Sequence, residues 1–175
     1  MEELDFKGLL DHFTKKGFQR GEQVILGHFG TVQTLLSLIF EEPCNVYDIR
    51  MDEKDGEIVR TINLRAGGPD EVVVCEAMSH IPIDRNRFDV VHDITSGKLG
   101  LGQIVVVHEI PNHRVLSEVG HDNKAFWRTY VIEGPNLIIE IHEHFPREPF
   151  EKVGWIGRID WPNLNYQRSM QPEEG

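Results

Sequence analysis

The sequence lacks any long apolar run. No stretch reaches the roughly 20 apolar residues that a membrane-spanning helix needs. The first residues, MEELDFKGLLDHF, carry acids where a secretory signal would carry bases. We therefore expect a soluble, cytoplasmic protein with no membrane partner.

Cysteines and basic residues are also few. Cys44 and Cys75 are too few for a disulfide framework and form no Cys-x-x-Cys pair, so we interpret both as buried apolar residues. With 18 Lys and Arg against 29 Asp and Glu, the net charge is -11. Nucleic-acid binding needs a basic surface, so we expect no nucleic-acid partner. A small anionic ligand remains compatible with this charge if a few arginines point into a secluded pocket.

Apolar residues make up an ordinary 39% of the 175 residues and recur with clear periods. A chain of this length builds one core rather than two, so we assign residues 1–175 to a single domain. Helical spacing of apolar residues predicts three helices, over residues 6–13, 31–40 and 85–94. Each is followed by a residue that ends helices: Gly17, Pro43 and Gly97.

A period of two predicts seven strands, over residues 45–51, 57–65, 71–81, 103–109, 113–119, 125–133 and 137–145. The segments DEKDG and AGGPD separate the first three strands and have turn compositions typical of hairpins. We expect the tail after Pro146 to form less regular structure, because its apolar residues follow no clear period. The predicted fold is α+β, with a single antiparallel β-sheet and helices packed on one side.

Two charged residues lie on strand faces that are otherwise apolar. Alternation places Arg60 on one face with Ile58, Ile62 and Leu64. It places Glu143 on one face with Leu137, Ile139, Ile141 and Phe145. A lone buried charge is costly, so each of the two needs a partner or a ligand group.

Periodicity leaves two interpretations of these charges open. Arg60 and Glu143 form a buried salt bridge with each other, or a bulge returns one of them to water. Alternatively they are opposite poles of one pocket, with Arg60 for a carboxylate and Glu143 for a hydroxyl or proton transfer. Arg128 shares a face with Tyr130 and either adds positive potential near a ligand or lies at the sheet rim with its head in water. For Arg128 we favour the rim.

Five motifs occur in a specific order along the chain: GTVQTLL at 30–36, VRTINL at 59–64, HIPIDR at 80–85, GKLGLGQI at 97–104 and FWRTYVIEGPNLIIEIHEHFP at 126–146. In this order and spacing, residues 28–146 resemble the chorismate lyase family, including its archaeal and mycobacterial-type branch. The chain departs from that pattern by an insertion at 65–71. It also has AMSHIP where bacterial members carry an arginine ahead of the Val/Ile-Pro pair.

The resemblance implies a lyase that converts chorismate to 4-hydroxybenzoate and pyruvate without a metal or other cofactor. By position, Arg60 corresponds to the arginine that holds the substrate carboxylate, and Glu143 to the acid near the ring hydroxyl. The resemblance also implies that main-chain groups around Gln33 and Leu101 hold the carboxylate. Segments 28–33 and 97–103 would then cover the ligand.

Two rival interpretations remain. Five histidines suggest a metal site, namely His108, His113, His121, His142 and His144. However, His142 and His144 fall on the strand face opposite Glu143. The same fold resembles the effector-binding domain of a class of bacterial transcription regulators. That similarity makes a non-catalytic binder of a small aromatic or carboxylate ligand the alternative. The 27 residues before His28 carry four Lys and Arg against five Asp and Glu and so have no excess of positive charge, and we therefore expect no attached DNA-binding module.

Overall fold

The computed structural model describes residues 6–67 and 71–157. Part of the AGGPD turn, residues 68–70, lies outside the described residues. The tail from residue 158, which contains Trp161, also lies outside them. Six strands form one sheet: β1 (Asn45–Lys54), β2 (Glu57–Ala66), β3 (Val72–Pro82), β4 (His113–His121), β5 (Ala125–Gly134) and β6 (Leu137–Pro146). Their order is β1-β2-β3-β6-β5-β4, and every neighbouring pair is antiparallel. The predicted α+β fold with a single antiparallel sheet is confirmed.

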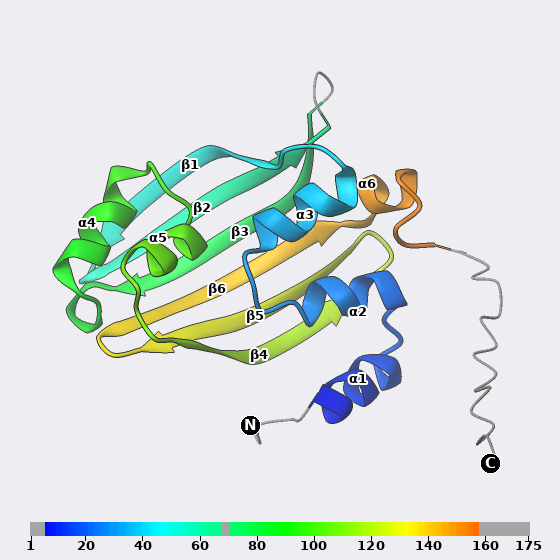
Figure 1. Cartoon of the computed structure of the whole chain (residues 1–175), viewed down its shortest axis with the longest axis horizontal. Coiled ribbons are helices and arrows are strands. Elements are labelled where there is room, and N and C mark those ends of the chain that lie inside the picture. Colours follow the sequence, from blue (N-terminus) through cyan, green and yellow to red (C-terminus); the bar gives the residue numbers. More distant parts are fainter. Residues whose placement is uncertain (1–5, 68–70, 158–175) are drawn as a thin grey trace, which may run out of the picture.

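The helices lie over one face of this sheet and at its ends (Figure 1). They are α1 (Phe6–Lys15), α2 (Arg20–Leu26), α3 (Val32–Phe40), α4 (Phe88–Ser96), α5 (Leu101–Val107) and α6 (Arg147–Lys152), with a 3-10 turn at Ile83–Arg85. No helix in the described part of the chain is long and apolar enough to cross a membrane. The other face of the sheet carries exposed residues such as Glu76, Met78 and Glu140.

The hairpin between β1 and β2 shows how local sequence sets the strand register. Asp55 and Gly56 have φ angles of 55° and 81°, and Lys54 pairs with Glu57. Two successive positive φ angles are the geometry of a two-residue turn, which Asp-Gly adopts readily. This turn fixes the pairing of β1 with β2, and therefore the face on which Arg60 lies.

The strand predicted over residues 103–109 is wrong, because residues 103–107 belong to α5 and the next two form a turn. The β-branched run Ile-Val-Val-Val has high strand propensity, but tertiary packing overrides a propensity of this size. Leu101, Ile104 and Val105 are buried, whereas Val106 and Val107 are 70% and 62% exposed. This i, i+3, i+4 pattern of burial is that of a helix lying on a sheet.

Besides α5, two short helices were not predicted. In α2, a capping box marks the start, because the Gln19 backbone N–H donates to Glu22 Oε2 at 2.8 Å. In α6, six residues follow directly after β6 in the segment that the sequence indicated as irregular. Periodicity is weak over so few residues, which is why the apolar pattern missed both.

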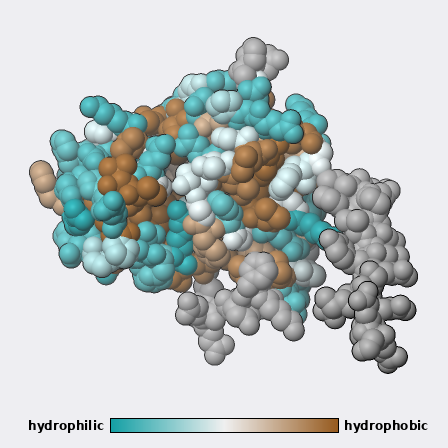
Figure 2. Space-filling view, viewed as in Figure 1, coloured by the Kyte–Doolittle hydropathy of each residue, from teal (hydrophilic) through white to brown (hydrophobic). Residues whose placement is uncertain are grey.

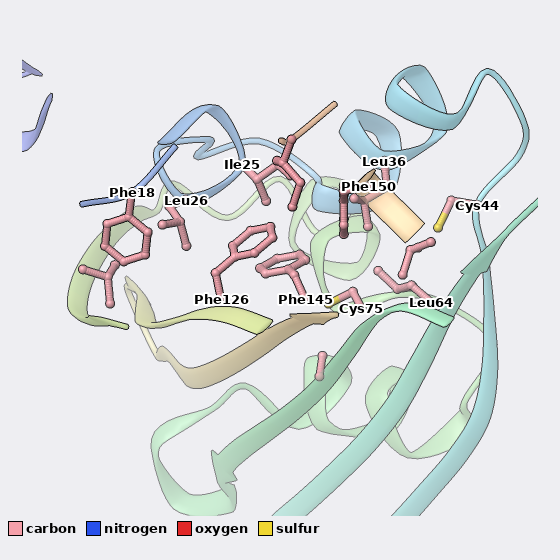
Figure 3. Packing of buried hydrophobic residues seen from close by; sticks show 14 of the residues in the cluster. Phe18, Ile25, Leu26, Leu36, Cys44, Leu64, Cys75, Phe126, Phe145 and Phe150 are labelled. Carbon is pink, nitrogen blue, oxygen red and sulfur yellow. The ribbon is translucent and has the colours of Figure 1, made fainter. Parts of the chain in front are cut away.

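The core has two parts, which lie over the two ends of the sheet. Beneath α1, α2, α3 and α6 the rings of Phe126 and Phe145 stack with centroids 5.0 Å apart, and Phe150 packs edge-on against both (Figure 3). Cys44 and Cys75 are buried in this cluster as free thiols, as predicted. The second cluster lies beneath α4 and α5 and consists largely of Ile and Val side chains. The candidate site lies where these two clusters meet.

Candidate functional site

A cavity opens between the two core clusters, over the middle of the sheet. Its walls include Ile62 and Leu64 from one side and Ile132 and Leu101 from the other. The space open to the centre of a water-sized molecule is about 60 Å³. One water needs only about 10–15 Å³ on that measure, so the cavity has room for a larger group. Its lining is mostly apolar with a few charged side chains, which is typical of sites for small molecules.

Strand register brings the charged residues of this cavity together. Arg60 pairs with Ser79, Ser79 with Ile141, and Ile141 with Tyr130, so these four form one row across β2, β3, β6 and β5. Glu143 lies two residues beyond Ile141 on the same face. Both charged residues line the cavity, so the predicted strand faces are confirmed.

Arg60 is a buried cation with few partners. It is 1% exposed, and its Nη2 donates to the Leu99 carbonyl oxygen at 3.1 Å. Its Nε and Nη1 are buried without a hydrogen-bond partner, and no carboxylate in the described part of the chain lies within ion-pair distance. Burial lowers the pKa of the Arg60 guanidinium from its ordinary value. Two of the three guanidinium nitrogens therefore carry N–H groups that no acceptor in the described residues satisfies.

Glu143 is buried too, but both of its oxygens are engaged. Oε2 accepts a hydrogen bond from Arg128 Nε at 2.6 Å, and Oε1 accepts one from the Tyr130 hydroxyl at 3.0 Å. Burial and the adjacent Glu143 carboxylate raise the pKa of Tyr130, so its phenol keeps the proton it donates. Of the two alternatives that the sequence left open, the Arg60–Glu143 salt bridge is therefore wrong. The partner of Glu143 is Arg128.

The favoured position of Arg128 at the rim is also wrong, because the side chain is 2% exposed. Its Nη1 donates to the carbonyl oxygens of Ile25, Leu26 and His28, at 2.9, 3.0 and 2.7 Å. These carbonyl groups lie at the C-terminal end of α2. Carbonyl oxygens at a helix C-terminus lack intrahelical N–H partners and attract a cation. Burial opposes the charge, but the Glu143 carboxylate outweighs burial and the pKa of Arg128 is raised. Arg128 supports Glu143 from behind and does not itself line the cavity.

Two helices begin at the cavity and form its cover. Thr31, Val32 and Gln33 at the start of α3 line one side, and Gly100 to Gln103 at the start of α5 line the other. Both segments were expected at the ligand. The Gln33 side chain is already bound, since its Nε2 donates to the Cys44 carbonyl oxygen at 2.7 Å. Apolar side chains gather on the outside of both helices, where Leu38 and Val106 are exposed (Figure 2).

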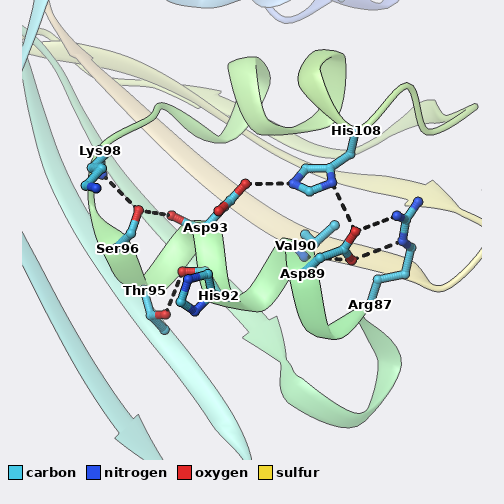
Figure 4. A network of polar contacts seen from close by, with 9 residues as sticks. All are labelled: Arg87, Asp89, Val90, His92, Asp93, Thr95, Ser96, Lys98 and His108. Carbon is cyan, nitrogen blue, oxygen red and sulfur yellow. Dashed lines mark hydrogen bonds and ion pairs between the residues drawn. The ribbon is translucent and has the colours of Figure 1, made fainter.

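A polar network fastens α5 to α4. His108 Nε2 lies 2.8 Å from Asp93 Oδ2, and His108 Nδ1 lies 3.2 Å from Asp89 Oδ2 (Figure 4). Arg87 holds Asp89 in turn. The network fixes the C-terminal end of α5, while the Leu99 carbonyl bound to Arg60 fixes the loop that leads into it. Arg60 thus lies beneath a cover that is tied at both ends.

Sequence reasoning missed three polar residues of the site, Arg114, Ser79 and Tyr130. Ser79 alternates with Ala77 and Ile81 on the buried face of β3, which would have indicated it. Arg114 is harder to assign because β4 has a register shift between Leu116 and Glu118. Such a bulge reverses the strand face that simple alternation assigns to the residues before it.

The histidines do not gather at one point. His142 and His144 lie on the outer face of β6, where Thr129 Oγ1 and Glu76 Oε2 are their neighbours at 2.9 and 3.5 Å. Within residues 6–67 and 71–157, no three His, Cys, Asp or Glu side chains form a group that could hold a metal ion. Compared with known proteins, the chain matches no family model and no curated protein.

Proposed function

We propose that the cavity binds a ring carboxylate at Arg60, and that the protein is a chorismate lyase, which converts chorismate to 4-hydroxybenzoate and pyruvate. The observation that carries the proposal is the Arg60 guanidinium, buried in a mostly apolar cavity with two of its three nitrogens unpartnered. An unpaired charge removed from water is expensive, so folds keep one chiefly where a ligand supplies the opposite charge. A carboxylate fits because the planar fork of arginine binds it through two parallel hydrogen bonds.

The reaction is an elimination in which atoms balance without a further reactant. The C3–O bond to the enolpyruvyl group breaks, the C4 proton is lost, and the ring becomes aromatic. The departing enolpyruvate takes up a proton and becomes pyruvate. Aromatisation supplies much of the driving force, so the protein has to bind, orient and exclude water.

Each charged residue has a task in this scheme. Arg60, on β2, holds the ring carboxylate. Glu143, on β6, faces the ring hydroxyl. Glu143 can accept that hydroxyl's hydrogen bond because each carboxylate oxygen retains a further lone pair. Arg128 and Tyr130 keep Glu143 in position as an acceptor.

One observation favours a second candidate, a ligand-binding domain without catalysis. Glu143 accepts hydrogen bonds from the Arg128 guanidinium at 2.6 Å and from the Tyr130 phenol at 3.0 Å. This double support suits an acceptor that recognises a hydroxyl at least as well as a group that must exchange a proton. A binding domain would retain the site and its ligand but release no pyruvate.

The experiment is to incubate the purified protein with chorismate and to measure pyruvate by a coupled dehydrogenase and 4-hydroxybenzoate by chromatography. We expect both products in equal amounts, above a heat-denatured control, and unchanged turnover after chelator treatment. Binding of 4-hydroxybenzoate without product formation would support the binding domain instead. Activity lost to chelator and restored by zinc or iron would contradict the proposed site.

A further inference from the structure

We infer that Arg114 is a second carboxylate-binding group at the other end of the cavity, so that the site selects dicarboxylates. This inference rests on the proposed function, in which the substrate carries a ring carboxylate and an enolpyruvyl carboxylate. Arg114 is on β4, the edge strand, and lines the same cavity as Arg60. In the part of the chain that the structure describes, no carboxylate forms an ion pair with it.

The contacts of Arg114 hold its guanidinium while leaving donors free. Nη1 donates to the Gly30 carbonyl oxygen at 2.6 Å, and Cζ lies 5.5 Å from the centre of the Tyr130 ring. That ring also contacts Arg128, whose Cζ is 4.9 Å from its centre. A guanidinium bound to a carbonyl and a ring face loses little further freedom when an anion binds. Arg114 is therefore held in place and has no carboxylate of its own.

Sheet geometry places the two arginines at opposite ends of the cavity. In the order β2-β3-β6-β5-β4, Arg60 and Arg114 are four strands apart, which is about 19 Å between their strands at about 4.8 Å per step. Arg114 pairs with Ile132, which lies two residues after Tyr130 on β5. Arg114 is therefore in the row next to the one that contains Arg60 and Tyr130, on the same face of the sheet. Both side chains reach the same cavity from these distant strands. Two cations facing one space from opposite ends match a ligand with two separated anionic groups.

The two arginines differ in exposure, which suits different parts of such a ligand. Arg60 is 1% exposed and lies at the deep end, whereas Arg114 is half-buried at the edge strand. The ring carboxylate, which stays on the aromatic product, would bind at the deep end. The carboxylate of the departing group would bind Arg114 near the solvent, where that product can leave. Because solvent screens Arg114, its effect on affinity is smaller than that of Arg60.

A purely structural role for Arg114 predicts a different result. Its bond to Gly30 holds the loop that leads into α3, so its loss would loosen the cover for every ligand equally. The distinguishing measurement is therefore a pair of ligands that differ only in the second carboxylate. Such a pair is 3-(carboxymethoxy)-4-hydroxybenzoate and 3-methoxy-4-hydroxybenzoate, neither of which can undergo the elimination.

The experiment is calorimetric titration of both ligands into the wild type, Arg114→Gln, Arg60→Gln and Arg65→Gln. We expect the wild type to bind the dicarboxylate about tenfold tighter than the monocarboxylate, the lower end of the range for one charge-assisted pair. Arg114→Gln should abolish that preference and change monocarboxylate affinity less than threefold. Arg60→Gln should weaken both ligands. Arg65→Gln is the matched control, since Arg65 lies on β2 but pairs with exposed Asp48 and should change neither.

Equal weakening of both ligands by Arg114→Gln, or no preference in the wild type, would overturn the inference. Binding of neither ligand would overturn it together with the proposed function. If Arg114 gives the preference but chorismate yields no pyruvate, the lyase proposal fails and the dicarboxylate site stands. If chorismate is cleaved and Arg114→Gln leaves KM unchanged, the lyase stands and the second carboxylate site fails.

Discussion

Arg60 on β2 and Arg128 on β5 lie on the same face of one sheet, are 1% and 2% exposed, and yet have opposite surroundings. Arg128 has a carboxylate, three carbonyl oxygens and an aromatic ring around it. Arg60 has a single carbonyl oxygen. Burial of a charge therefore does not by itself mark a binding site. What marks it is burial without compensation from the protein.

The two arginines also differ in how many elements of the fold they connect. Arg128 joins three elements, because it connects β5 to Glu143 on β6 and to the end of α2. Its charge is part of the packing, and removing it leaves Glu143 as an unpaired buried anion. Arg60 connects β2 only to the loop before α5. Removing its charge relieves the fold of an uncompensated cation.

The largest effect should come from breaking the paired region. We expect Arg128→Met to lower the free energy of unfolding by about 3–5 kcal/mol, because one partner of a buried ion pair is left without compensation. Chemical denaturation followed by circular dichroism measures it. Arg65→Met, which breaks an exposed pair with Asp48, is the control and should cost less than about 1 kcal/mol. Equal costs for the two variants would show that Arg128 is not a structural ion pair.

A second effect should appear in turnover. If Glu143 takes part in proton transfer, Glu143→Gln should lower kcat for chorismate by roughly 100-fold or more and leave 4-hydroxybenzoate affinity within about tenfold. If Glu143 only orients the hydroxyl, the loss will be much smaller. The variant also leaves Arg128 uncompensated, so its melting temperature should fall, and kinetics must be measured well below that temperature. A stable Glu143→Gln protein with wild-type kcat would remove Glu143 from both roles.

The smallest effect should come from the unpaired region, and it should appear in binding. Arg60→Met should weaken 4-hydroxybenzoate binding by about 1.5–3 kcal/mol, the value of a charge-assisted hydrogen bond, as measured by calorimetry. Its unfolding free energy should stay equal or rise, in contrast to Arg128→Met, because no buried carboxylate loses its counter-charge and only the hydrogen bond to the Leu99 carbonyl oxygen is lost. Arg60→Lys should rescue binding poorly, since a point charge lacks the planar fork. Unchanged affinity in Arg60→Met would place the ligand elsewhere.

Sequence periodicity predicted the faces of Arg60 and Glu143 because the strand period is strict and the Asp55-Gly56 turn fixes the register of β2. It failed for residues 103–109, where β-branched residues form helix α5 over the sheet. Propensity differences there are small compared with the burial of Leu101, Ile104 and Val105. It also missed Arg114, because a bulge in β4 interrupts the alternation.

The sequence by itself determined that Arg60 and Glu143 lie on strand faces that are otherwise apolar, since alternation along one strand suffices for that. Only the tertiary structure decided which charge is compensated. Arg128 lies 15 residues from Glu143 and about 100 residues from the α2 carbonyls that it binds, and Arg60 lies 39 residues from Leu99. Partners at such separations depend on strand order and on where helices end over the sheet. The hydrophobic period of a single segment determines neither the strand order nor the place where a helix ends over the sheet. Both are set only by tertiary packing.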